Sequence, residues 1–98
     1  MQQDITQKAD QHTALLSNEG DMASFRFGGQ NIRFRAPYSL VRYTEVKEWD
    51  DGYLVVKALY DGPGETEDYI DLRPILDNLC INADEFLKPI KRVEVSYD

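Results

Sequence analysis

Side chains able to do chemistry are scarce in this sequence of 98 residues. Its one histidine, His12, lies in a polar stretch that supplies no rigid partner for a general base, so we interpret it as a solvated surface residue. Its one cysteine, Cys80, stands between two apolar residues without a basic neighbour, which predicts a small buried hydrophobe and not a nucleophile. We therefore assign no catalytic residue and expect a protein that is not an enzyme.

Carboxylates are the other candidates for chemistry, and they gather in two places. One is the pair Asp50 and Asp51. The other, between residues 61 and 71, holds no lysine or arginine and consists of Asp61, Glu65, Glu67, Asp68 and Asp71. Neither group has the spacing of a calcium-binding loop, and the glycine-rich turns lack the lysine of a phosphate-binding loop. We expect neither a metal site nor a bound cofactor, and a solvated acidic rim is the simplest interpretation.

The net charge of −7 is distributed unevenly along the chain. Residues 21–42 carry four arginines against one aspartate, a charge of +3, whereas residues 43–98 carry 14 acids against six bases, a charge of −8. Direct binding of nucleic acid is not expected, because contacts with phosphate need lysine and arginine. The row Arg26, Arg33 and Arg35 either pairs with acids of a neighbouring strand or touches phosphate, and both interpretations stay open.

Aromatic residues are interleaved with the acids beyond residue 43. Like charges on adjacent strands repel each other and cost stability, so solubility alone does not demand this arrangement. An acidic surface with aromatic anchors is complementary to a basic protein groove, such as one that normally holds nucleic acid. The residues expected to contact such a partner are Trp49, Asp50, Asp51, Tyr53, Glu65, Glu67, Asp68 and Tyr69.

Strands and turns must position these residues. Alternating phenylalanines and arginines around two glycines predict a hairpin over Met22–Ala36, with the rings facing the core and the arginines on the other face. A strand over Leu40–Trp49 keeps its alternation only with a bulge between Tyr43 and Val46. Asp51-Gly52 then turns the chain into a central strand, Tyr53–Tyr60, which is apolar on both faces and is expected to be covered on both.

The last third of the chain predicts one more strand pair with helices between its members. A strand over Glu67–Leu72 ends at a short helix capped by Asp71, and Asn82 with Glu85 predicts a second helical turn. The last strand is expected over Ile90–Tyr97, with Val93, Val95 and Tyr97 pointing inward.

Together these elements predict a single domain of the α+β class over residues 1–98. We expect an antiparallel meander sheet of about five or six strands, with short helices before the last strand. Within residues 1–20, apolar spacings of four and seven predict an N-terminal helix, and a frayed tail is the open alternative. The polar first ten residues do not resemble a signal peptide, no run is long enough to span a membrane, and one cysteine fits a reducing compartment, so we expect a cytoplasmic protein.

Four stretches, 43–49, 69–76, 86–91 and 93–95, resemble small uncharacterised acidic proteins encoded on mobile elements of Gram-positive bacteria. The resemblance covers a little over half of the chain and leaves out the arginine-rich hairpin. It implies a setting in which small acidic proteins block host defence nucleases by mimicking DNA or occupying its channel.

The leading hypothesis is thus a non-enzymatic inhibitor that covers a basic nucleic-acid-binding surface of a host defence nuclease, of the anti-CRISPR or anti-restriction type. An accessory or assembly module that pairs through a sheet edge, as a homodimer for example, is the first alternative. A small nucleic-acid-binding domain that uses the arginine hairpin is the second.

Overall fold

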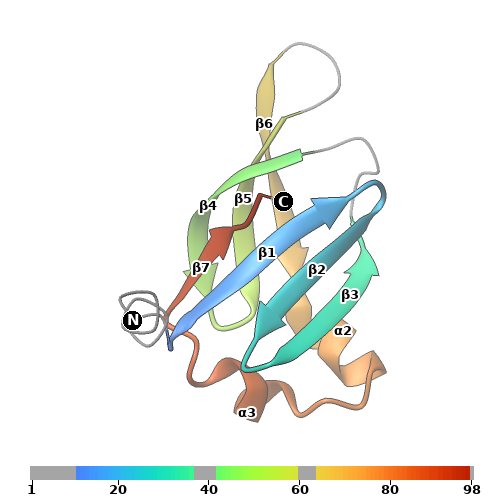
Figure 1. Cartoon of the computed structure of the whole chain (residues 1–98), viewed down its shortest axis with the longest axis vertical. Helices are drawn as coiled ribbons and strands as arrows, with labels where there is room; N and C mark the ends of the chain where they lie inside the picture. The colour runs from blue at the N-terminus through green and yellow to red at the C-terminus, as the bar shows by residue number, and fades with distance from the viewer. Residues whose placement is uncertain (1–10, 37–41, 60–63, 98) are drawn as a thin grey trace, which may run out of the picture.

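The computed structural model describes residues 11–36, 42–59 and 64–97, which form two sheets packed face to face with two short helices at one end (Figure 1). The first sheet has the strand order β3-β2-β1-β7 and the second has the order β4-β5-β6. In chain order the elements are β1 (Thr13–Glu19), β2 (Met22–Phe27), β3 (Gln30–Arg35), β4 (Arg42–Asp50), β5 (Tyr53–Leu59), β6 (Glu65–Asp71), α2 (Leu72–Asn78), α3 (Ala83–Leu87) and β7 (Arg92–Val95).

The first sheet grows from the arginine-rich hairpin that the sequence predicts. Strands β2 and β3 pair antiparallel with Phe25 opposite Ile32, and Gly28 and Gly29 both have positive φ in the two-residue turn between them. Strand β1 adds on the other side of β2, and β7 then pairs parallel to β1, with Ala14 opposite Val93. The first and last of the described strands therefore lie side by side in one sheet.

The second sheet is the antiparallel meander β4-β5-β6. The predicted bulge is confirmed, because the register of β4 against β5 shifts between Tyr43 and Glu45, and it shifts again between Val46 and Glu48. The hairpin signal is confirmed as well: Asp51 and Gly52 form a two-residue turn, both with positive φ. A side chain at Gly52 would come within 2.8 Å of Leu87 Cδ1, so the close approach of α3 also requires glycine.

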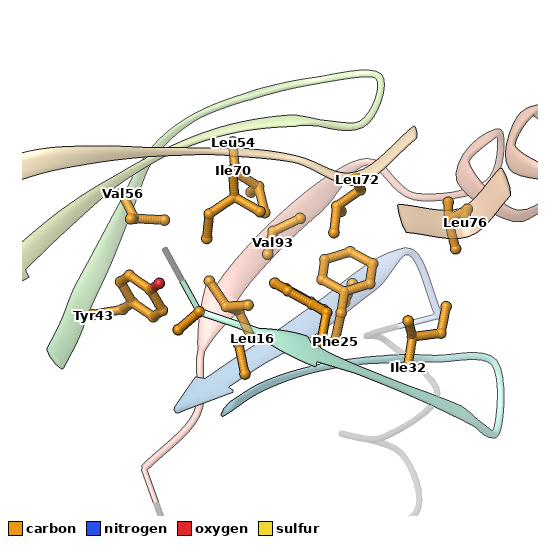
Figure 2. Packing of buried hydrophobic residues seen from close by; sticks show 14 of the residues in the cluster. Leu16, Phe25, Ile32, Tyr43, Leu54, Val56, Ile70, Leu72, Leu76 and Val93 are labelled. Atoms are coloured by element: carbon orange, nitrogen blue, oxygen red, sulfur yellow. The ribbon is translucent and has the colours of Figure 1, made fainter. Parts of the chain in front are cut away.

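The core lies between the two sheets. Leu54, Val56 and Ile70 of the second sheet face Leu16 and Phe25 of the first, and all five are almost fully buried (Figure 2). Apolar residues of α2 and α3 close one end of this core, among them Leu72, Leu76 and Leu87. Two sheets that share one apolar interior are the usual way for strands with one apolar face to bury it.

Both helices begin as the sequence predicts. The side chain of Asp71 accepts a hydrogen bond from the backbone N–H of Arg73 at the start of α2, and Asn82 accepts one from Glu85 at the start of α3. The Arg73 guanidinium then joins α2 to two other places, the Asp51 carboxylate at 2.7 Å and the Asp84 carboxylate at 2.9 Å. These two ion pairs raise the pKa of Arg73 and hold the β4–β5 turn against the helices.

Three expectations about the layout are corrected. The strands of the described residues form two sheets, not one meander, because β7 joins β1 and not its neighbour in sequence. They number seven, not five or six, because β1 is an additional strand. Within the proposed N-terminal helix, residues 13–19 are strand β1 and residues 11, 12 and 20 are in turns, whereas residues 1–10 lie outside the described residues. The class α+β holds in its broad sense, since strands and two separate short helices make up the described elements.

Four single residues also differ from expectation. The outer side of the central strand is open at both ends, since Tyr53 is 43 % exposed and Leu59 is 37 % exposed, although Val55 between them is buried. Tyr97 lies beyond β7 and is exposed instead of pointing inward. Cys80 is exposed because it follows the C-cap of α2 with a φ of 60°, a left-handed conformation that turns the chain away from the helix.

Candidate functional site

The outer face of β4-β5-β6 is the most unusual surface of the described residues, and we call it the acidic face. Alternation along the strands brings six carboxylates to this face against three cationic side chains, a net charge of −3. The carboxylates are those of Glu45, Glu48, Asp50, Glu65, Glu67 and Asp71. The cationic side chains are those of Arg42, Lys47 and Lys57.

Two tyrosines stack at one end of the acidic face, near the β4–β5 turn. The rings of Tyr53 on β5 and Tyr69 on β6 stack with their centroids 6.3 Å apart and an interplanar angle of 24°. Val55 lies opposite Tyr69 in the ladder and is buried, whereas Tyr69 itself is 55 % exposed. A stacked aromatic pair left this open to solvent is a large apolar surface at a fixed position, which suits a contact with another molecule.

The carboxylates around the tyrosines are neutralised unequally. Lys47 reaches Glu67 at 3.0 Å, which raises the pKa of the lysine, and Lys57 reaches Glu65 at 3.1 Å. Within the described part of the chain no ion pair is formed by Glu45, Glu48 or Asp50. In the ladder, Asp50 lies opposite Tyr53 and Glu48 lies opposite Val55, so the tyrosine end of the face keeps its negative charge.

Five of the eight residues expected to contact a partner share this face: Asp50, Tyr53, Glu65, Glu67 and Tyr69. Asp51 lies beside it in the β4–β5 turn, paired with Arg73. Glu45, Glu48, Leu59 and Asp71 belong to the same face and were not among the expected contacts. Two of these could have been predicted from the alternation of side chains along a strand. Leu59 shares a face with Tyr53 on β5, and Asp71 shares a face with Tyr69 on β6.

Trp49 is not on the acidic face. The second bulge of β4 turns its ring inward, where it stacks on Phe25 of the first sheet with centroids 6.1 Å apart, and its Nε1–H donates a hydrogen bond to the carbonyl of Ile90 at 3.4 Å. Trp49 is therefore a packing residue that joins the two sheets, and we remove it from the set of contact residues.

Asp68 also faces the interior and is removed from the contact set, because it is 4 % exposed. Its Oδ1 accepts a hydrogen bond from the backbone N–H of Tyr69 at 2.9 Å, and its Oδ2 has no hydrogen-bond partner. Burial raises the pKa of Asp68, and the hydrogen bond from the N–H of Tyr69 lowers this pKa by a smaller amount. Burial and the charge of Asp68 together raise the pKa of Tyr43, whose buried hydroxyl also lacks a partner.

Replacing Asp68 by asparagine is expected to stabilise the protein at pH 7 by on the order of 1 kcal/mol, since it removes a buried charge and keeps the acceptor for Tyr69. An acid whose pKa is raised by folding binds more protons in the native state, so its cost to stability appears as the pH rises above the ordinary value of 3.8. Chemical denaturation should show no advantage for Asp68→Asn at pH 3 and a growing one toward pH 7. An advantage that is the same at both pH values would contradict the assignment.

The arginine row lies on the opposite surface of the molecule, the outer face of the first sheet. Arg33 lies 3.6 Å from Glu19, and Arg35 lies 3.3 Å from Asp21. Two of the three arginines are thus paired with acids, as the first of the two interpretations expected. The acids lie on β1 and in its following turn, however, and not on β2, the strand next to β3. Arg26 keeps a buried Nε without a hydrogen-bond partner.

Residues with catalytic chemistry do not converge anywhere in the described residues. His12 is exposed, and its Nδ1 lies 3.0 Å from the carbonyl oxygen of Pro89. Residues 11–36, 42–59 and 64–97 contain no group of three histidine, cysteine or acidic side chains able to hold a metal ion. None of the helices in these ranges is long and apolar enough to cross a membrane.

Comparison with known proteins places the chain in a family. Neither the curated proteins nor the solved structures contain a significant match. A family model does match residues 12–98, and its description states no activity, partner or source, so the resemblance to acidic proteins of mobile elements stays a prediction. Because this match covers nearly all of the chain, the protein belongs to the family described as Domain of unknown function (DUF7724).

Proposed function

We propose that this protein is a non-enzymatic binding protein that docks its acidic face on a basic surface of another protein. The observation that carries the proposal is the exposed Tyr53–Tyr69 stack, bordered by the unpaired carboxylates of Glu48 and Asp50. Buried aromatic anchors surrounded by a charged rim are the usual composition of a protein interface hot spot.

Charge complementarity indicates the chemistry of the partner. A net charge of −7 on the whole chain and −3 on the acidic face repels acidic proteins and nucleic acid and attracts a lysine- and arginine-rich surface. Flat sheet faces suit flat or shallow partners, and the tyrosines supply rings that lose little conformational entropy when they are buried.

Within this proposal the partner is a nucleic-acid-processing enzyme, and the acidic face covers the surface with which that enzyme binds nucleic acid. Such surfaces carry the dense positive charge that a carboxylate-rich sheet complements. Inhibition of a host defence nuclease of the anti-CRISPR or anti-restriction type is the most specific form of this function. One cysteine fits a reducing compartment, so we place the interaction in the cytoplasm.

Affinity capture from a lysate of the encoding organism tests the proposal when three baits are compared. The variant Glu48→Lys/Asp50→Lys reverses two unpaired charges of the acidic face and is expected to weaken retention of the partner at least about tenfold. The control variant Asp77→Lys/Glu85→Lys makes the same change in net charge on the exposed surfaces of α2 and α3.

The wild type and the control should retain the same protein, and moderate salt should release it. If both variants retained equally little of the partner, only the total charge of the protein would matter. If the amount retained did not change with ionic strength, a charge-driven contact would be contradicted.

Pairing through a sheet edge is the second candidate, because β3 and β6 each end a sheet within the described residues and, unlike β4 and β7, do not lie against each other. A tight dimer in sedimentation equilibrium, with no basic protein captured, would favour such an assembly role over the acidic-face proposal.

A further inference from the structure

Within the described residues four strands end a sheet, and two of these, β4 and β7, contact each other. The other two, β3 and β6, have an open edge, and the structure identifies the backbone groups along each. At the end of β3 the N–H of Ala36 donates to Asp21 at 2.8 Å, so alternate residues back to Ile32 point their backbone groups toward β2. At the end of β6 the N–H of Leu72 donates to Gly52 at 2.7 Å, so Asp68 and Ile70 point theirs toward β5. The open edges therefore belong to the residues between them, which include Arg33 on β3 and Tyr69 on β6.

The two open edges are complementary in charge. Along β3 the outward residues are Asn31, Arg33 and Arg35, and along β6 they are Glu65, Glu67, Tyr69 and Asp71. An antiparallel pairing of β3 with β6 of a second copy places Arg33 opposite Glu67 and Arg35 opposite Glu65. The ion pairs that Arg33 and Arg35 make within one copy are exposed and therefore weak competitors.

Such a pairing would not stop at two molecules. The first copy would still offer its free β6 and the second copy its free β3, so the contact is heterologous and extends into an open-ended chain. Unprotected strand edges are the usual starting point of this kind of aggregation, and an inward-pointing charge on an edge strand is one of the devices that prevents it.

Asp68 occupies the position where such a device would act. Its Oδ1 already holds the N–H of Tyr69, which is one of the outward donors that an added strand would need. Its Oδ2 is buried without a partner, and in the pairing described above the carboxylate would lie opposite Ile32, an apolar and buried residue.

We propose that Asp68 is an edge guard: its buried carboxylate blocks the open edge of β6 and keeps copies of this chain from adding β6 to β3. This role is independent of the acidic face and accounts for a buried charge that otherwise only costs stability. It also implies that partners approach the face of the second sheet and not its edge.

Substitution by valine tests the guard, with Thr66→Val as the matched control on the same strand and the same inner side. Asp68→Val frees the N–H of Tyr69 and removes the charge, so self-association in sedimentation velocity should begin at a concentration about tenfold or more below that of the wild type. Thr66→Val should behave as the wild type does. If Asp68→Val stays monomeric wherever the wild type does, the proposal fails.

Two further variants identify the surfaces involved. Adding Glu67→Pro to Asp68→Val removes another outward N–H without touching the β5 ladder, so it should restore the monomer. Adding Arg33→Glu should do the same through the other edge. Association that survives both additions would show that it runs through another surface and would overturn the proposed pairing.

Amide hydrogen exchange of the wild type tests the guard without any substitution. The N–H of Tyr69 and that of Glu67 both point to the open edge, but only the first is held by the Asp68 carboxylate. Tyr69 should therefore exchange at least about tenfold more slowly than Glu67 after correction for intrinsic rates. Equal protection would overturn the assignment even if Asp68→Val failed to fold.

Discussion

Replacing Tyr53 and Tyr69 together by alanine is expected to weaken binding of the captured partner roughly a hundredfold while the fold persists. The two rings are 43 % and 55 % exposed, so they contribute little to the core, and each truncated hot-spot residue typically costs about 1–2 kcal/mol of binding free energy. Calorimetric titration of the purified partner measures the loss, and circular dichroism checks the fold.

Tyr97 provides the matched control for this pair. It is also an exposed tyrosine, at 71 %, but it lies after β7, where its hydroxyl donates a hydrogen bond to the carbonyl of Thr44 at 2.8 Å. Tyr97→Ala should leave the affinity within about twofold of the wild type. A loss for Tyr97→Ala as large as that for the Tyr53/Tyr69 pair would remove the acidic face from the interface.

Truncation of Phe25 is expected to have the largest effect on stability. Its ring is 1 % exposed and lies between the sheets, with its centroid 6.1 Å from that of Trp49 and 6.2 Å from that of Phe86. Phe25→Ala removes this contact between β2, β4 and α3 and leaves a cavity, which typically lowers the free energy of unfolding by about 3–5 kcal/mol. A loss of that size is a large fraction of the total stability of a domain of this length.

The neighbouring ring of Phe27 is the control for that effect. It is only partly buried, and its contact with Phe86 is an edge-to-face pair with centroids 6.1 Å apart. Denaturant unfolding should show a smaller loss for Phe27→Ala than for Phe25→Ala, by at least about 1 kcal/mol. Equal losses would contradict the central place of Phe25 in the packing of the two sheets.

Features set by neighbours in sequence were predictable. The hairpin over β2 and β3, the turn at Asp51-Gly52, the first bulge of β4 and both helix caps each depend on a few adjacent residues. These patterns carry their own physical cause, such as glycine at positive φ or a side-chain oxygen that accepts from a helical N–H.

The arrangement of the strands was not predictable, because it depends on contacts between distant parts of the chain. Leu16 fits an apolar helical spacing in isolation, yet it lies in a strand because β1 is held by β2 on one side and by β7 on the other. The parallel pairing of β1 with β7 leaves no signal among residues that are neighbours in sequence. Local patterns alone therefore predict one continuous meander.

The candidate site was predictable in its composition and less so in its membership. Alternation from Ile70 already implied that Asp68 points inward, but the rule that charges stay in water favoured placing it on the surface. Trp49 was misplaced because a second bulge in β4 reverses the alternation ahead of it. In both cases burial, which only the tertiary structure shows, decides which side chains a partner can reach.

Hydrogen–deuterium exchange of the complex with the captured partner gives the most direct test of where binding occurs. Protection that appears on binding should cover residues 45–59 and 65–71, the strands that carry the acidic face, and should leave β2 and β3 unchanged. Protection confined to the strands β3-β2-β1-β7 would place the interface on the arginine-bearing side and contradict the proposed function.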